Sequence, residues 1–176
     1  MKIDVRKVTL TDIELLQAIA KQTFIETFAT ENSEENMRNY LADSFSIAKI
    51  TEELNNINSV FYFAQLNTKV IGYLKINTAQ AQTELKHEQA LEIERIYVLK
   101  EFYGKQIGQL LYNTALQLAQ AFGCNYLWLG VWEHNERAIN FYTKNNFVAF
   151  DKHIFKLGDD EQTDILMKLQ LNNNSI

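Results

Sequence analysis

Residues 91–132 restrict the fold more than any other part of the sequence, because they read as strand, loop, helix and strand in direct succession. Residues 91–99 alternate in polarity and then become mostly apolar, which predicts a strand. Residues 107–122 carry apolar side chains at intervals of three and four, and Gly123 follows as a helix stop. Residues 126–132 are almost uninterruptedly apolar, which is typical of a strand covered on both faces. The unit predicts two strands joined by a helical crossover.

The rest of the sequence adds strands and helices on either side of this unit. A helix is expected to begin at a cap formed by Thr11 or Asp12, whereas residues 26–39 look less regular. A short turn at Asn67 and Thr68 predicts an antiparallel hairpin between two of the strands. Further strands are expected at 3–8, 60–65, 70–76, 147–155 and 165–171, and further helices at 46–54 and 138–142. The predicted fold class is α+β, with a mixed, largely antiparallel sheet.

The composition fits one domain. The chain has 176 residues, of which 47% are hydrophobic, and this is enough for a sizeable core. Residues 1–171 are expected to form the domain and residues 172–176 a frayed tail. Cys124 is the only cysteine, and the histidines lack metal-ligand spacing, so no metal site is predicted.

The charge and the hydrophobic pattern exclude several classes of partner. A formal net charge of -5 argues against binding to nucleic acid or to an anionic membrane and favours cationic partners. No run approaches the roughly eighteen apolar residues of a membrane span, and the N-terminus lacks the apolar stretch of a signal peptide. The sequence therefore predicts a cytoplasmic protein.

The start of the helix at residue 107 has the features of an anion site. Between Phe102 and Trp132 there is no Asp or Glu, and Lys105 is the only charged side chain. The first N–H groups of a helix lack partners and carry partial positive charge, which a carboxylate or hydroxyl cap usually satisfies. Gly104 and Gly108 let the backbone approach a ligand closely, so the loop is a candidate socket for phosphate or pyrophosphate. The alternative is a loop capped by water.

Two segments together resemble a known family. The strand at residues 93–99, the loop "EFYGKQIGQLL" and the later segment "VWEHNERAINFYTKNNF" are similar, in this order, to the GNAT superfamily of acetyl-CoA-dependent N-acetyltransferases. The likeness covers about residues 91–150. It implies a single domain with a twisted mixed sheet, helices on both faces, and acetyl-CoA as co-substrate.

The resemblance also implies which residues hold the coenzyme. In the family, the strand before the loop splays from its neighbour and its main chain pairs with the pantetheine arm, while the loop amides hold the pyrophosphate. An Asn after the next strand contacts the pantetheine arm, with an Arg nearby, and a Tyr hydroxyl faces the sulfur. The matching positions are Ile96, Tyr97 and Val98 for the strand, Gly104, Lys105, Gln106, Ile107, Gly108 and Gln109 for the loop, and then Asn135, Arg137 and Tyr142.

The loop departs from the family pattern Gln/Arg-x-x-Gly-x-Gly/Ala at two positions. Tyr103 stands at the first position, and Gln106 replaces the central glycine, so a side chain lies where the backbone normally passes close to phosphate. Asn146 replaces a glycine after the last helix, and Asn tolerates a left-handed conformation better than most residues. Gln106 is expected to weaken coenzyme binding without abolishing it.

Acetyl transfer to an amine needs a proton acceptor and a proton donor. An alkylammonium has a pKa of about 10.4, so a base has to remove its proton near neutral pH. Glu92 and Glu94 are the candidates, on one face of the strand, although ion pairs with Arg95 or a Lys would explain them equally well. The main-chain N–H of Val98 could polarise the thioester carbonyl. Tyr142 would protonate the departing sulfur, and its alternative role is core packing.

The acceptor is expected to be a cationic amine. Glu26, Glu31, Glu34 and Glu35 lie in the region where the superfamily shapes its acceptor site, and "TFIETF" with the acidic stretch after it resembles bacterial spermine/spermidine N-acetyltransferases. A solvated charged face is the alternative for these residues. Acetylation of a protein or peptide amine stays open, as does a non-catalytic acyl-CoA-binding regulatory module. A homodimer is also left open.

Overall fold

The computed structural model describes residues 2–158 and 160–171 and contains one seven-stranded sheet. Its strands lie in the order β1-β2-β3-β4-β5-β7-β6. β4 and β5 run parallel, whereas every other neighbouring pair is antiparallel. The strands are β1 (Ile3–Lys7), β2 (Ser59–Leu66), β3 (Lys69–Thr78), β4 (Ala90–Val98), β5 (Tyr126–Trp132), β6 (Val148–Leu157) and β7 (Asp160–Gln170).

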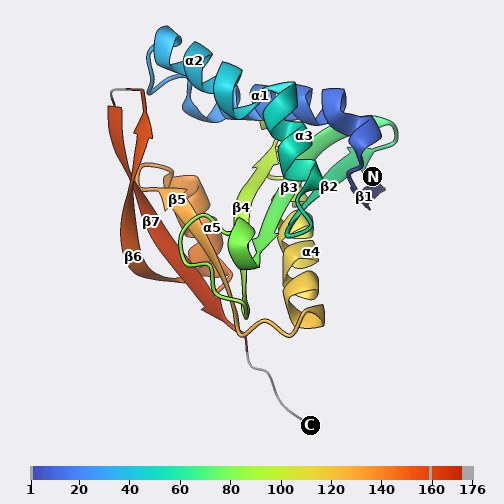
Figure 1. The fold of residues 1–176 in the computed structure, drawn as a ribbon, viewed down its shortest axis with the longest axis vertical. Coiled ribbons are helices and arrows are strands. Elements are labelled where there is room, and N and C mark those ends of the chain that lie inside the picture. The colour runs from blue at the N-terminus through green and yellow to red at the C-terminus, as the bar shows by residue number, and fades with distance from the viewer. Residues whose placement is uncertain (1, 159, 172–176) are drawn as a thin grey trace.

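The helices cover both faces of this sheet, which confirms the predicted α+β fold (Figure 1). α4 makes the crossover between the parallel strands β4 and β5, as the sequence predicts, and α1 and α3 pack against strands of the first half of the sheet. The helices are α1 (Ile13–Phe28), α2 (Glu34–Ser44), α3 (Ile47–Asn55), α4 (Ile107–Ala121) and α5 (Glu136–Lys144).

Two features of the helices differ from the prediction. The segment expected to be less regular is mostly helical: α1 continues to Phe28, and α2 begins after Ser33, whose Oγ accepts the N–H of Asn36 at 3.2 Å. Asp12 does not cap α1 through its side chain. Its carboxylate instead accepts two hydrogen bonds from Arg6, each of 2.8 Å, and another from the Thr9 N–H.

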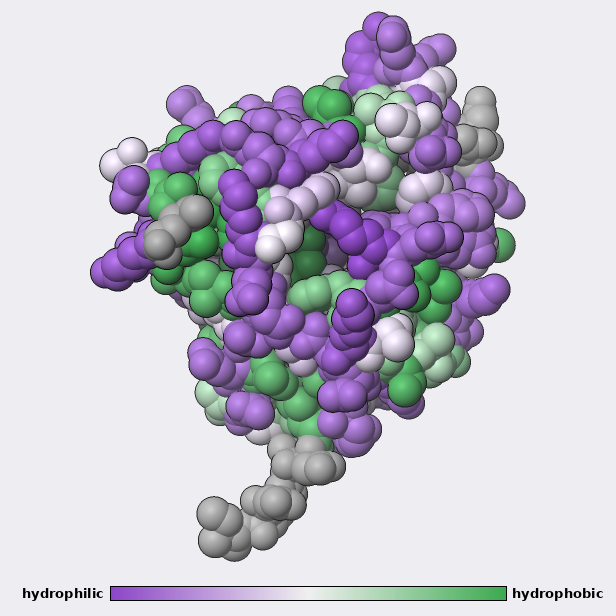
Figure 2. Space-filling model, turned by 180° about the vertical axis from the view of Figure 1, so that it is seen from behind, coloured by the Kyte–Doolittle hydropathy of each residue, from purple (hydrophilic) through white to green (hydrophobic). Residues whose placement is uncertain are grey.

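The core runs through the whole sheet and includes Cys124, which is buried as a free cysteine. The face of the molecule turned away from the view of Figure 1 is mostly hydrophilic, with apolar groups in small separate patches and at the floor of a hollow (Figure 2). Among the described residues, no helix has the length and apolarity to cross a membrane. The predicted tail, residues 172–176, lies outside the described residues.

The parallel strands β4 and β5 separate soon after they pair. Their backbones are paired only from Ala90 to Glu92, opposite residues 126–128. Beyond this point β4 continues beside β3, where the register shifts by one residue after Lys75, while β5 continues beside β7. The gap between the diverging strands is the place where the candidate site forms.

Candidate active site

A groove of about 640 Å³ lies between the end of β4, the loop before α4, and α5. We call it the loop groove. It is lined by Ile96, Tyr97, Val98, Gly104, Gln106, Ile107, Gly108, Gln109, Asn135, Arg137 and Tyr142, together with Thr27, Phe102, Tyr103, Ala138, Phe141 and Lys144. These include all the residues assigned to the coenzyme from the sequence except Lys105. The Lys105 ammonium lies over the Phe102 ring, 4.7 Å from its centroid.

The N-terminus of α4 opens into the loop groove without a side-chain cap. Gln106 occupies the cap position with a φ of 61°, and its side chain makes no capping hydrogen bond. Gly104 has a φ of 75°, and a Cβ atom built on Gly104 or Gly108 would meet no atom within 4 Å. The free amides and the open space beside them fit a phosphate group. Gln106 therefore keeps the left-handed conformation expected of the glycine that it replaces.

The charges of the loop groove suit a polyanionic ligand. Arg137 and Lys144 line it, and no Asp or Glu does so among the residues that the structure describes. The Arg137 guanidinium is stacked on the Tyr103 ring at 3.5 Å from its centroid. Lys144, in the last turn of α5, was not predicted as a coenzyme residue, because the family resemblance assigns no role to its position.

Hydrogen bonds hold α5 in place beside the groove. The Asn135 Oδ1 accepts the Ala138 N–H at 3.1 Å and so caps α5. At the other end of α5, Asn145 and Gln109 exchange side-chain hydrogen bonds of 3.0 and 3.3 Å. The start of α4 and the C-terminal end of α5 are therefore joined beside the groove.

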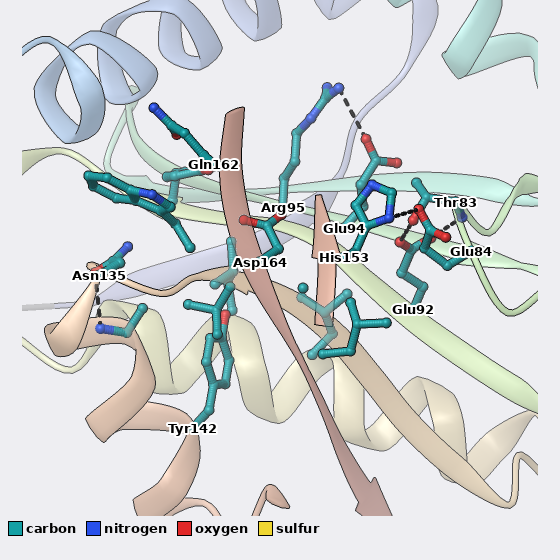
Figure 3. Close-up of a pocket in the computed structure, with 18 of the residues that line it drawn as sticks. Thr83, Glu84, Glu92, Glu94, Arg95, Asn135, Tyr142, His153, Gln162 and Asp164 are labelled. Atoms are coloured by element: carbon teal, nitrogen blue, oxygen red, sulfur yellow. Dashed lines mark hydrogen bonds and ion pairs between the residues drawn. The ribbon is translucent and has the colours of Figure 1, made fainter. Parts of the chain in front are cut away.

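A second cavity, of about 270 Å³, is lined by residues of α1, β4, β5 and β7 (Figure 3). We call it the acidic cavity, because its lining includes the carboxylates of Glu84, Glu92, Glu94 and Asp164. Ile96, Tyr97, Asn135, Ala138 and Tyr142 line both this cavity and the loop groove. The two spaces therefore meet beside the Tyr142 side chain.

Glu92 is a buried carboxylate with three hydrogen-bond donors. Its oxygens accept the Thr83 N–H at 2.9 Å, the Thr83 hydroxyl, and the Asn77 amide at 2.9 Å. Only 3% of Glu92 is exposed, and this burial raises its pKa, although the bonds from Thr83 and Asn77 oppose the rise. A raised pKa suits a proton acceptor, but the donors occupy its oxygens.

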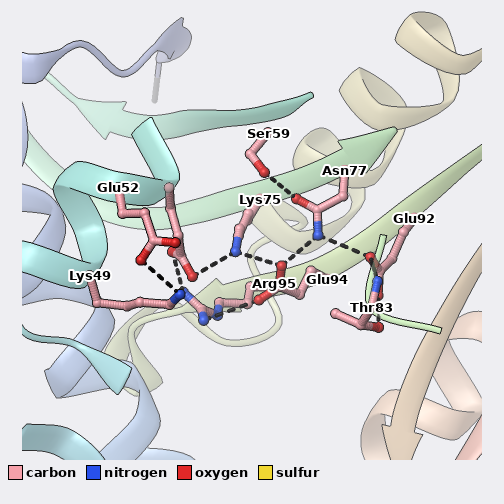
Figure 4. A network of polar contacts seen from close by, with 10 residues as sticks. Lys49, Glu52, Ser59, Lys75, Asn77, Thr83, Glu92, Glu94 and Arg95 are labelled. Atoms are coloured by element: carbon pink, nitrogen blue, oxygen red, sulfur yellow. Dashed lines mark hydrogen bonds and ion pairs between the residues drawn. The ribbon is translucent and has the colours of Figure 1, made fainter. Parts of the chain in front are cut away.

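Glu94 belongs to a network of ion pairs (Figure 4). Its carboxylate lies 2.6 Å from the Lys75 ammonium and 3.1 Å from the Arg95 guanidinium, and Glu53 contacts the same two cations at 2.9 and 3.3 Å. Burial alone would raise the pKa of Glu94, but Arg95 and Lys75 outweigh it and hold the pKa below its ordinary value. The ion-pair interpretation therefore holds for Glu94, and a lowered pKa makes it a weak base.

Tyr142 is 6% exposed and lies where the two spaces meet. Burial raises its pKa, so the hydroxyl stays protonated at neutral pH. Its ring packs against Phe141 and Phe147, and no hydrogen bond engages its hydroxyl within the described part of the chain. Tyr142 thus has a packed ring and a hydroxyl free to donate.

The acidic side chains of the cavity differ from those expected. None of the four glutamates of residues 26–35 lines it: Glu26 accepts the Lys100 N–H at 2.7 Å, and Glu31, Glu34 and Glu35 are exposed. The solvated-face alternative is correct for these last three. The cavity receives Phe24 and Phe28 from α1, and its carboxylates come from β4, β7 and the connection before β4.

Sequence analysis missed Asp164, Glu84 and His153. His153 lines the acidic cavity and pairs through Nδ1 with Glu84 at 3.1 Å. No local pattern marks these side chains: the pairing of β5, β7 and β6 brings Asp164 and His153 to the site, and Glu84 comes from the connection before β4 and pairs with His153.

The sequence is similar to those of known proteins. The model of the Acetyltransferase (GNAT) family matches residues 14–147. An uncharacterised N-acetyltransferase encoded in the pepI 3' region of Lactobacillus delbrueckii subsp. lactis is 40% identical over 165 residues, covering 94% of this chain and 95% of that protein. A spermidine N(1)-acetyltransferase of Thermoplasma acidophilum is 26% identical over 172 residues, covering 96% of this chain and 97% of that protein.

The fold is also found among solved structures. The PaiA N-acetyltransferase from Thermoplasma acidophilum, crystallised with coenzyme A, superposes with a TM-score of 0.79 at 24% identity, covering 97% of this chain and all of that one. The chain belongs to the acetyltransferase (GNAT) family. It is an N-acetyltransferase that takes its acetyl group from acetyl-CoA.

Proposed function

We propose that this enzyme acetylates a primary amino group of a small cationic amine, with a polyamine such as spermidine or spermine as the best candidate. The observation that carries the proposal is the junction at Tyr142 of an acidic cavity with a groove that, among the described residues, is lined by cations and by no carboxylate. A polycationic acceptor is attracted to the first space and an anionic coenzyme to the second. The name of the Thermoplasma relative, a spermidine acetyltransferase, adds weak support.

The size of the acidic cavity favours a small amine over a folded protein or peptide. Its volume of about 270 Å³ lies near the lower end for ligand sites. Its lining includes Gln162 of β7, whose amide donates to the Asn32 Oδ1 at 2.9 Å and so ties the β6–β7 hairpin to the connection between α1 and α2. A peptide chain would need a more open path at this place.

The residues of the loop groove have a positioning role in this proposal. The α4 amides from Gln106 to Gln109, with Gly104, would hold the pyrophosphate, and the main chain from Ile96 to Val98 would pair with the pantetheine arm. Asn135 and Arg137 would complete the coenzyme site. When bound, acetyl-CoA supplies an acetyl group already activated as a thioester.

The remaining roles concern protons and charge. The Val98 N–H would polarise the carbonyl, and the Tyr142 hydroxyl would give its proton to the departing sulfur. Glu92 fits the role of proton acceptor better than Glu94, because its pKa is raised and that of Glu94 is lowered. A cytoplasmic location and a homodimer stay predictions.

A thiol-release assay with acetyl-CoA tests the proposal. Spermidine, spermine, a monoamine of similar length and a peptide with a free N-terminus serve as acceptors at pH 7.5. We expect the highest kcat/KM with the polyamines, and mass spectrometry of the product should show one added acetyl group on nitrogen. Faster turnover of the peptide than of either polyamine would contradict the proposal. Binding of acetyl-CoA by calorimetry without turnover of any acceptor would favour a non-catalytic module.

A further inference from the structure

Among the described residues, Asp164 is the carboxylate of the acidic cavity whose side chain makes neither a hydrogen bond nor an ion pair. The side chain is half-buried. The other three carboxylates are engaged: Glu92 by hydrogen-bond donors, Glu94 by two cations, and Glu84 by His153. A half-buried carboxylate that faces a cavity and makes no hydrogen bond or ion pair is available to a cationic ligand.

Asp164 also lies at the end of the acidic cavity where the loop groove begins. On β7 it is paired in register with Trp132 of β5. Trp132 is four residues beyond Trp128, the last residue of β5 that pairs with β4, which corresponds to about 13 Å along the strand. Glu92, opposite Trp128, therefore lies near the closed end of the gap between the strands. Asp164 lies near the open end, where Tyr142 lines both spaces.

A glycine leaves the space in front of Asp164 open. A Cβ atom built on Gly130 would come within 3.5 Å of the Asp164 Oδ2, so the carboxylate lies directly over this glycine. Gly130 and Asp164 both line the acidic cavity, into which Tyr142 also points from α5 (Figure 3). A larger side chain at position 130 would stand beside the carboxylate and narrow the approach to it.

Charged groups face Asp164 from several elements. His153 lies opposite it on β6, and β4 contributes Glu92 together with the mutually paired Glu94 and Arg95. Glu84 comes from the connection before β4, Tyr142 comes from α5, and the β5 residues of the lining are uncharged. Burial raises the pKa of Asp164, and His153 offsets part of the rise. The carboxylate is thus more basic than an exposed Asp.

We propose that Asp164 binds the reacting ammonium group of the acceptor and accepts its proton. This assignment rests on the proposed function and makes Asp164, rather than Glu92 or Glu94, the base of the reaction. One proton passes from the ammonium to the carboxylate, which frees the nitrogen lone pair. The nitrogen–carbon bond forms and the carbon–sulfur bond breaks. Tyr142 protonates the sulfur and is reprotonated by the second nitrogen proton, and Asp164 passes its proton to water.

The pH dependence of kcat/KM for spermidine in Asp164→Asn and Glu92→Gln tests the assignment. General base catalysis typically contributes 10²- to 10⁴-fold, so we expect Asp164→Asn to lower kcat/KM at pH 7 by at least about 10²-fold. The deficit should shrink as the pH approaches the amine pKa of about 10.4, because the acceptor then arrives neutral. Asp164→Glu should recover part of the rate at pH 7. Asp151→Asn, on the exposed part of β6, is the matched control and should retain full activity.

Each result has a defined meaning. If only the proton step is lost, the affinity of every variant for acetyl-CoA should stay within twofold of wild type. The melting temperature of every variant should stay within about 3 °C of wild type. A deficit in Asp164→Asn that is below threefold, or that is the same at pH 7 and pH 10, overturns the assignment. So does a pH-dependent loss found in Glu92→Gln alone. Wild-type protein without turnover of any amine would instead overturn the proposed function, and the assignment with it.

Discussion

The Arg137 guanidinium is stacked on the Tyr103 ring at 3.5 Å from the ring centroid, which joins α5 to the loop before α4. Both residues line the loop groove. The resemblance to the family expects Gln or Arg at position 103, so this contact is a departure from the family pattern.

The stack predicts a role for Tyr103 in coenzyme affinity. A cation–π contact at an exposed site contributes about 0.5–1 kcal/mol, so we expect Tyr103→Ala to raise the Kd for coenzyme A roughly two- to fivefold by releasing Arg137. Tyr103→Phe keeps the aromatic face and should leave the Kd unchanged. Calorimetry at fixed ionic strength measures both. Equal weakening in the two variants would assign the effect to the Tyr103 hydroxyl instead.

Gly108 allows helix stability and coenzyme binding to be separated. A carboxylate in the first turn of a helix stabilises it by about 0.3–1 kcal/mol, but in α4 it would occupy the space proposed for the pyrophosphate. We therefore expect Gly108→Asp to raise the free energy of unfolding slightly and to raise the Kd for coenzyme A at least tenfold. Urea denaturation and calorimetry measure the two quantities. Unchanged affinity in Gly108→Asp would place the pyrophosphate elsewhere.

Gln106 stores backbone strain that glycine would relieve. A left-handed conformation costs a residue with a Cβ about 1–2 kcal/mol, which a glycine at position 106 would avoid. The greater freedom of glycine in the unfolded chain offsets part of this stabilisation. We expect Gln106→Gly to raise the free energy of unfolding by about 0.5–1 kcal/mol in urea denaturation. Gln106→Ala keeps the Cβ and should bring no such rise. Equal stabilities of the two variants would mean that φ at this position relaxes without cost.

The loop groove could be predicted from the sequence because its signals are local. The loop, the absence of carboxylates after Phe102, and the apolar period of α4 all lie within one stretch of sequence, and the structure brings Gly104, Gly108 and Asn135 to one groove. The left-handed φ values of Gln106 and Asn146 agree with the glycines expected at those positions.

The lining of the acidic cavity could not be predicted from local patterns. Asp164 reaches the site only because β7 inserts between β5 and β6, and a single sequence does not reveal which strands pair. The ion pairs of Glu94 depend on Glu53 of α3 and Lys75 of β3 meeting in space. α2 gives a weak helical signal because Met37 is its only buried residue.

Tyr142→Phe removes the proposed proton donor and keeps the packed ring. We expect kcat to fall about 10²-fold, while the Kd for acetyl-CoA stays within twofold of wild type. Because burial raises the pKa of Tyr142, its ionisation should not appear in the pH profile of the wild-type enzyme between pH 6 and 9. Tyr112→Phe is the control, since this buried tyrosine of α4 lines neither cavity. A fall of kcat below threefold in Tyr142→Phe would exclude it as the donor.

The buried ion pairs of Lys75 should contribute to the stability of the fold. Its side chain is 4% exposed and its ammonium lies between Glu53 and Glu94, so Lys75→Met should lower the free energy of unfolding at pH 7 by about 3 kcal/mol. Lys49→Met removes an exposed ion pair with Glu52 and should change it by less than about 0.5 kcal/mol.

The pH dependence of this effect follows from Glu94, whose pKa is lowered in the folded protein. A lowered folded-state pKa stabilises the fold above the unfolded value of about 4.3, and this contribution is lost as the pH falls through the folded value. Wild-type stability should therefore decline on acidification below about pH 4.5, and the decline should be smaller in Lys75→Met because Glu94 has lost one of its two cations. Urea denaturation between pH 3 and pH 7 measures this difference, and parallel curves for the two proteins would show that Lys75 does not set the pKa of Glu94.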